Sequence, residues 1–251
     1  MNYTLHPKFK PDTDFFTDII ENYSSKGEDY GNQNRNSLKL FDFKGITINV
    51  KSFKVPNIIN QIVYRFFRKS KAERSYEYAN RLTNLGIGTP TPIGFYEFKS
   101  IFLFNKSYYI SEHLDYELTY RELTTDFDYP NHEEILRAFT RFTFNLHEQG
   151  VNFLDHSPGN TLIRREGDEY KFYLVDLNRM EFKNLNLSER VKNFAKLTTH
   201  KSMIEVMSDE YAKCTNSDYA RIFDLMWSET NKFQEKFHRR RRLKKQIKFW
   251  K

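Results

Sequence analysis

The segment from Asp155 to Asn160 reads DHSPGN and contains the residue types that phosphoryl transfer requires. A second carboxylate, Asp176, follows sixteen residues after Asn160, at the end of an apolar run. In the protein-kinase fold, one carboxylate orients the attacking hydroxyl and accepts its proton, while an amide and a second carboxylate hold magnesium on the phosphates. We therefore predict Asp155 as the catalytic residue, with Asn160 and Asp176 as magnesium ligands and ATP as the phosphate donor.

An ordinary surface turn is the alternative interpretation of this hexapeptide. Asp, Ser, Pro, Gly and Asn all favour turns, so the six residues alone are weak evidence. The surrounding pattern favours the catalytic interpretation, because a long helical pattern ends at Gly150 and a short strand ends at Asp176.

Lys51 is the candidate for contacting the phosphates of the nucleotide. It lies near the end of the alternating segment Ile46 to Phe53, where a kinase carries a lysine that pairs with a helix glutamate. Glu73 and Glu77 share one face of the next helical pattern, and we choose Glu77 because it lies nearer the helix centre. A solvated lysine and a surface glutamate are the alternatives. No GxGxxG motif is present, so the segment from Asn32 to Ser37 is the candidate cover for the phosphates.

The elements that must position these residues follow from hydrophobic periodicity. The first 36 residues are polar, and the segment 24–36 resembles a loop. Two strands follow at 37–43 and 46–53. Helical patterns cover 57–67 and 72–85, with a basic break at 68–71 between them. Three strands are expected at 93–96, 100–104 and 107–114. A helix at 131–149, strands at 161–164 and 171–176, and a mainly helical remainder complete the chain.

This order predicts an α+β protein with a two-lobed, protein-kinase-like fold. Residues 1–113 form an N-terminal lobe with an antiparallel sheet and a helix, and residues 114–251 form a mainly helical catalytic lobe. The nucleotide cleft is expected near 112–115, so Glu112 and Leu114 become candidate ATP-binding residues.

Composition favours a folded protein without disulfide bonds. Hydrophobic residues make up 39% of the 251 residues and aromatic residues 17%, which excludes a disordered chain. The single cysteine, Cys214, excludes a disulfide framework. No signal peptide and no membrane-spanning stretch are recognisable, so we expect a cytoplasmic location or attachment to the cytosolic face of a membrane.

The net charge of +7 comes from residues 237–251, the basic tail. This segment carries eight Lys or Arg residues, no acidic residue and several large apolar ones. An anionic membrane surface is the favoured partner. A solvated helix end is the main alternative, and nucleic acid is not expected.

Several segments of the chain resemble, in order, the lipopolysaccharide kinase family of Kdo kinases and WaaP-like enzymes, above all versions from Bacteroidetes-type bacteria. The segments are KSFKVPNIIN, RKSKAERSYEYANRL, GIGTPTPIG, SYYISEHL, HEQGVNFLDHSPGNTLI and FYLVDLNRM. The resemblance covers about 38–190. It supports Glu77 over Glu73, but the family's histidine two residues before the catalytic Asp is Phe153 here.

The resemblance implies an ATP- and magnesium-dependent kinase that phosphorylates a sugar hydroxyl of the lipopolysaccharide inner core, in first place Kdo on lipid A. It also implies a peripheral position on the cytosolic face of the inner membrane. Two alternatives stay open: a kinase of the same fold with another acceptor, and a non-catalytic scaffold that binds a membrane through the tail.

Overall fold

The computed structural model describes residues 1–32 and 36–249 and divides the chain into two compact units. The first unit contains residues 1–115 and 176–178, and the second contains 116–175 and 179–251. The boundary expected from the sequence, after residue 113, lies two residues before this division. Part of the predicted phosphate cover, residues 33–35, and Trp250 of the basic tail lie outside the described residues.

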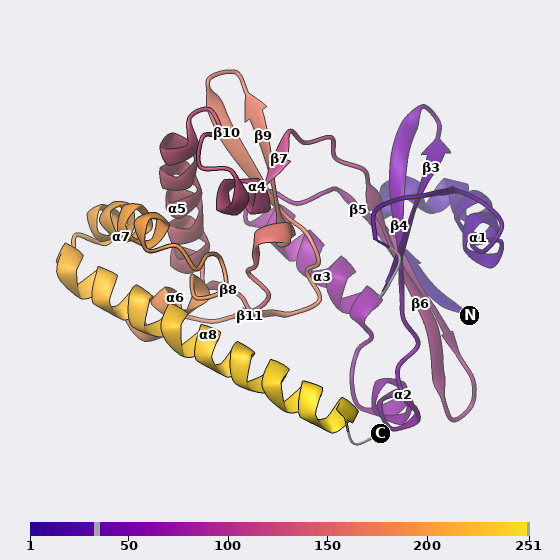
Figure 1. The fold of residues 1–251 in the computed structure, drawn as a ribbon. Coiled ribbons are helices and arrows are strands. Elements are labelled where there is room, and N and C mark those ends of the chain that lie inside the picture. Colours follow the sequence, from indigo (N-terminus) through magenta and orange to yellow (C-terminus); the bar gives the residue numbers. More distant parts are fainter. Residues whose placement is uncertain (33–35, 250–251) are drawn as a thin grey trace. The chain divides into compact units, whose positions relative to one another are not determined.

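The first unit is built on a six-stranded antiparallel sheet with the order β1-β5-β6-β4-β3-β2 (Figure 1). Its strands are β1 (Asn2–Leu5), β2 (Glu28–Asp29), β3 (Ser37–Phe43), β4 (Ile46–Phe53), β5 (Pro92–Lys99) and β6 (Phe104–Glu112). Its helices are the 3₁₀ turn η1 (Pro7–Asp12), α1 (Thr13–Glu21), α2 (Ile58–Phe66) and α3 (Lys71–Asn84).

The structure of this unit differs from the sequence prediction in two regions, the first 36 residues and the strands after α3. The polar opening contains β1, η1, α1 and β2, whereas the sequence predicted only a loop at 24–36. Helix α1 forms because Phe16, Ile19 and Ile20 share one face and pack into the core of this unit. Two strands, β5 and β6, replace the three that were expected. Ser100 closes the hairpin between them, since its amide donates to Leu103 O at 2.8 Å and its hydroxyl accepts from the Leu103 amide.

The second unit is mainly helical. Its helices are α4 (Tyr120–Thr125), α5 (His132–Glu148), the 3₁₀ turn η2 (Pro158–Asn160), α6 (Leu187–Asn193), α7 (Lys201–Thr215) and the long α8 (Tyr219–Phe249). Its short strands are β7 (Leu118–Thr119), β8 (Val151–Phe153), β9 (Thr161–Glu166), β10 (Glu169–Leu174) and β11 (Met180–Phe182). Figure 1 shows α5 and α7 close to each other, with α8 as the yellow helix of this unit.

Aromatic side chains fill the core of the second unit, as the composition predicts. Tyr120, Phe139, Phe194 and Tyr211 are fully buried there, and the rings of Tyr120 and Phe139 lie 4.4 Å apart. This core fixes α5 and α6, which flank the loop that carries Asp155. Within the described residues, no helix combines the length and apolar character that crossing a membrane requires.

Candidate active site

The loop that carries Asp155 leaves a short strand and is closed by its own last residue. Strand β8 pairs with β11, and the Leu154 amide donates to Arg179 O directly afterwards. The side-chain amide nitrogen of Asn160 then donates to Asp155 O at 2.8 Å. This bond uses the nitrogen of Asn160 and leaves its amide oxygen without a hydrogen bond in the part of the chain that the structure describes. The sequence prediction placed both residues on one tight loop, and the structure brings them together.

Two cations face the carboxylate of Asp155 within the second unit. Lys196 Nζ lies 3.5 Å from Asp155 Oδ1, and an Arg179 guanidinium nitrogen lies 3.9 Å from the same atom. Lys196 also donates to Leu154 O, which anchors its ammonium group to the loop backbone. The Asp155 side chain keeps 31% of its surface exposed, so a hydroxyl can reach it.

The first unit holds Asp176 in a left-handed backbone conformation beside Lys51. Asp176 has φ +58°, a region that is sparsely populated outside glycine and that Asp and Asn adopt more readily than other residues. Its Oδ1 accepts from Asn178 Nδ2 at 2.7 Å and lies 2.7 Å from Lys51 Nζ. Such a conformation persists where the surroundings over-determine it, which is common at functional sites.

Comparison with known proteins identifies the family to which the chain is similar. The family model described as "Lipopolysaccharide kinase (Kdo/WaaP) family" matches residues 53–224, which is more than half of the chain. The chain belongs to this family. Membership confirms the resemblance seen in the sequence and implies an ATP-dependent phosphotransferase. A search of curated proteins finds no significant match.

A solved structure confirms the kinase-like fold. The structure described as WaaP in complex with acyl carrier protein matches at a TM-score of 0.65 and 16% identity, over 94% of this chain and 99% of that one. A mitogen-activated protein kinase from Leishmania major matches at a TM-score of 0.45 and 16% identity, over 85% of this chain and 64% of that one. The second score is too low to support an argument.

The lysine–glutamate pair expected of a kinase is not formed in this family member. Glu77 pairs with Lys69, and Lys51 pairs with Asp176 instead. The alternative, Glu73, lies 3.7 Å from Lys69, and burial followed by the negative charge of Glu97 raises its pKa. Ala72 and Tyr76 of α3 pack against Phe53 and Phe95, while Glu73 and Glu77 of the same helix lie beside Lys69.

The predicted nucleotide-binding segment follows the last strand of the first unit. Glu112 ends β6, and its amide donates to Thr91 O at 2.9 Å. His113 donates to Thr47 O at 2.8 Å, so the backbone before Leu114 is tied to the sheet. Contact of Glu112 and Leu114 with ATP stays a prediction.

Asn160 and Asp176, the predicted magnesium ligands, belong to different units, and each carries an oxygen donor of the kind that magnesium prefers. Among the described residues, no group of three or more His, Cys, Asp or Glu side chains could hold a metal ion. Magnesium usually takes only one or two carboxylates and completes its shell with water and substrate phosphates. Asp176 offers a carboxylate, and Asn160 offers an amide oxygen that makes no hydrogen bond within the described chain. These hard oxygen donors suit the ion.

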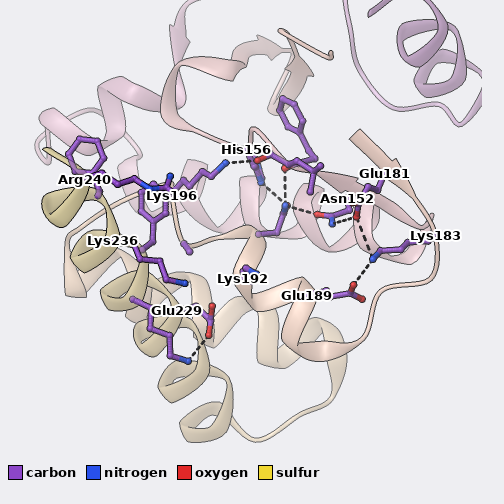
Figure 2. Close-up of a pocket in the computed structure, with 17 residues that line it drawn as sticks. Asn152, His156, Glu181, Lys183, Glu189, Lys192, Lys196, Glu229, Lys236 and Arg240 are labelled. Atoms are coloured by element: carbon purple, nitrogen blue, oxygen red, sulfur yellow. Dashed lines mark hydrogen bonds and ion pairs between the residues drawn. The ribbon is translucent and has the colours of Figure 1, made fainter. Parts of the chain in front are cut away.

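A network of buried polar side chains holds the Asp155 loop against α6. Asn193 of α6 donates to Phe153 O at 2.9 Å and to Asn152 Oδ1 at 3.0 Å. Its own Oδ1 lies 3.0 Å from His156 Nδ1 and 3.4 Å from His147 Nε2, so each histidine donates to it. The network links β8, the loop and α5 through one side chain (Figure 2 shows the Asn152 and His156 part).

This network predicts a loss of stability in mild acid. Burial lowers the pKa of His156 to about 4 and that of His147 to about 3, against about 6.5 in an unfolded chain. At pH values between the pKa in the folded protein and the pKa in the unfolded chain, the unfolded state binds more protons than the folded state. The free energy of unfolding therefore falls as the pH falls below 6.5. We expect a loss of roughly 1 kcal/mol per pH unit for each histidine.

Urea denaturation between pH 7.5 and 4.5 measures this slope. His156→Phe, which keeps a ring beside Phe139 and Phe153, should reduce the slope by about half. A replacement of the exposed His238 should leave it unchanged. Equal slopes for the wild type and the His156 variant would contradict the prediction.

Proposed function

We propose that this chain transfers the γ-phosphate of ATP to a sugar hydroxyl of the lipopolysaccharide inner core, and specifically to Kdo linked to lipid A. The family match supports the reaction class. The observation that carries the proposal is the geometry of Asp155, whose carboxylate faces two cations and remains accessible. A scaffold would not need this carboxylate together with Asn160 and Asp176.

In the proposed reaction, Asp155 orients the acceptor hydroxyl and takes its proton as the oxygen attacks phosphorus. Asn160 and Asp176 would hold magnesium, which supplies charge neutralisation on the phosphates when it is bound. Lys51 neutralises the α- and β-phosphates, and Lys196 holds the Asp155 carboxylate in place. Glu112 and Leu114 would contact the nucleotide base.

We place the protein on the cytosolic face of the inner membrane, as a peripheral protein. The eight cations of the basic tail suit the anionic lipid surface. The structure described as WaaP is a complex with acyl carrier protein, which makes a carrier protein the alternative partner to test.

Mass spectrometry of Kdo–lipid A after incubation with purified protein, ATP and magnesium tests the reaction. A gain of one phosphate is the expected result. If a soluble sugar were phosphorylated and Kdo–lipid A were not, the proposed acceptor would be wrong and the proposed kinase activity would stand. Absence of ATP binding would refute the kinase proposal in favour of the scaffold.

A further inference from the structure

A cavity of about 590 Å³ lies beside the Asp155 loop, entirely within the second unit (Figure 2). One wall is a single face of α8, because its lining residues recur at three- and four-residue intervals: Glu229, Lys232, Phe233, Lys236, Phe237 and Arg240. The opposite wall comes from α6, the residues that follow it, and the loop. This volume suits a small organic ligand.

The charge of the lining is unbalanced. Three glutamates line the cavity, and each already has a lysine partner: Glu181 and Glu189 pair with Lys183, and Glu229 pairs with Lys232. Lys192, Lys236 and Arg240 have no carboxylate within ion-pair distance in the described chain. The lining therefore carries six cations and three carboxylates. Four of these cations pair with none of the three carboxylates, and of these four only Lys196 lies within 4 Å of another acid of the described chain, Asp155.

The cavity lies next to the reacting group of the proposed kinase, and the two sequence neighbours of Asp155, Leu154 and His156, line it. Lys196 lines it as well and lies 3.5 Å from the Asp155 carboxylate. The rings of Phe153, Phe233 and Phe237 add apolar surface against which a sugar ring can pack.

We propose that this cavity binds an anionic group of the acceptor, a carboxylate or a phosphate carried by the sugar whose hydroxyl Asp155 orients. Unpaired lysine and arginine side chains bind such groups through charge-assisted hydrogen bonds. The face of α8 that lines the cavity, which includes Phe237 and Arg240 of the basic tail, thereby becomes part of the acceptor site. The inference rests on the proposed kinase function and adds the residues that select the acceptor.

Charge reversal at Lys236 tests the proposal. Lys236→Glu should raise the KM for Kdo–lipid A in detergent micelles about tenfold or more and leave the KM for ATP unchanged. Lys192→Glu, on the opposite wall, should do the same. Arg221→Glu is the matched control, because Arg221 is an exposed cation of α8 that does not line the cavity.

A binding measurement separates this proposal from the kinase proposal. Inorganic phosphate, added in the presence of a saturating non-hydrolysable ATP analogue, should raise the melting temperature of the wild type and of Arg221→Glu, and should not raise that of Lys236→Glu. An equal shift in all three proteins overturns the cavity proposal even if the enzyme is active. A shift lost only in Lys236→Glu supports the cavity even if Kdo–lipid A is not the acceptor.

An independent observation concerns the first unit, where apolar side chains gather on the surface. None of the nine residues of α2 is buried, and Ile59 is 71% exposed. Phe67, directly after the helix, is 81% exposed, and Ile101 and Phe102 at the β5–β6 hairpin tip are 75% and 69% exposed. Soluble proteins rarely expose apolar residues in such groups without a partner.

The helix and the hairpin tip form one surface, which we name the apolar patch: residues 58–67 together with 101 and 102. Arg65 Nε donates to Ser100 O at 3.0 Å, and the ring of Tyr64 lies 5.7 Å from that of Phe104. Segments 54–71 and 99–106, which contain the patch, carry seven Lys or Arg residues and no acidic residue. Lys69 and Lys99 pair with glutamates of neighbouring segments.

We infer that the apolar patch inserts into the interface of a membrane that contains anionic lipids. An apolar helix face bordered by cations is the arrangement of interfacial helices, in which the side chains enter the acyl boundary and the cations meet lipid phosphates. The patch belongs to the other unit, and apolar residues predominate in it, whereas cations predominate in the basic tail.

Vesicle co-sedimentation tests this surface. The full chain should bind vesicles that contain phosphatidylglycerol far better than pure phosphatidylcholine vesicles, and Ile59→Glu and Phe102→Glu should each weaken binding at least tenfold. Ile46→Glu, at an exposed apolar residue outside the patch, is the control. Unchanged binding of both patch variants would overturn the inference and make the tail the anchor. If the chain did not bind vesicles but bound purified acyl carrier protein, the inference would be wrong and the patch would be a protein interface.

Discussion

Asp155→Asn should lower the rate of phosphate transfer to Kdo–lipid A by about 10²–10⁴-fold, while ATP binding stays within twofold of the wild type. Asparagine has the shape of aspartate, so the loop closed by Asn160 should remain intact. The variant cannot accept the proton of the acceptor hydroxyl, and Lys196 and Arg179 lose the charge that they face. The measurement is kcat and KM from a radiolabelled ATP assay, together with calorimetric ATP binding.

A matched change elsewhere separates loss of the catalytic carboxylate from a general effect of Asp→Asn substitution. Asp168 lies in the exposed turn between β9 and β10, and its closest cation, Arg165, is 3.7 Å away. Asp168→Asn should retain full activity. If Asp155→Asn also retained activity within threefold, the proton would pass to another group, and Asp155 would be a structural residue of the loop.

Much of the fold could be predicted from the sequence because the relevant signals are local. The alternation at 37–53 predicted β3 and β4, and the apolar periodicity at 131–149 predicted α5 within one residue at each end. Helix α1 was missed because polar residues dominate the first 36 positions. Its signal is confined to Phe16, Ile19 and Ile20, whose burial depends on a sheet formed later in the chain.

The candidate site was predictable only where its residues are close in sequence. Asp155 and Asn160 lie on one loop, so their spacing was informative. Lys196 was missed, because a lysine near the end of a helical pattern has the same local signal as a surface lysine. Its contact with Asp155 depends on how α6 packs against β8.

The failure of the predicted Lys51–Glu77 pair has a similar origin. A helical pattern shows that Glu73 and Glu77 share a face, and it does not show which strand that face meets. In the structure, the side of α3 that carries Ala72 and Tyr76 packs against Phe53 and Phe95, and Glu77 pairs with Lys69. The direction of a helix face is a property of packing, and no local pattern encodes it.

The second large effect is expected at Asp176. Asp176→Asn should reduce kcat/KM for ATP by about 10²–10³-fold, because it removes the charge of a predicted magnesium ligand and of the partner of Lys51. Asparagine tolerates the left-handed backbone at this position, so folding should not change. Asp176→Ala should lose the same activity and, in addition, about 1 kcal/mol or more of stability, since alanine is strained at φ +58°.

ATP binding measured with and without magnesium separates the role of this carboxylate from that of the backbone. The wild type should bind ATP more tightly when magnesium is present, and Asp176→Asn should lose that difference. Asp42→Asn, a change of the same kind at an exposed position of β3, should keep it. If Asp176→Asn still bound ATP more tightly with magnesium than without it, the carboxylate would serve only to position Lys51. In that case Lys51→Met should lose as much activity as Asp176→Asn and should keep magnesium-dependent ATP binding.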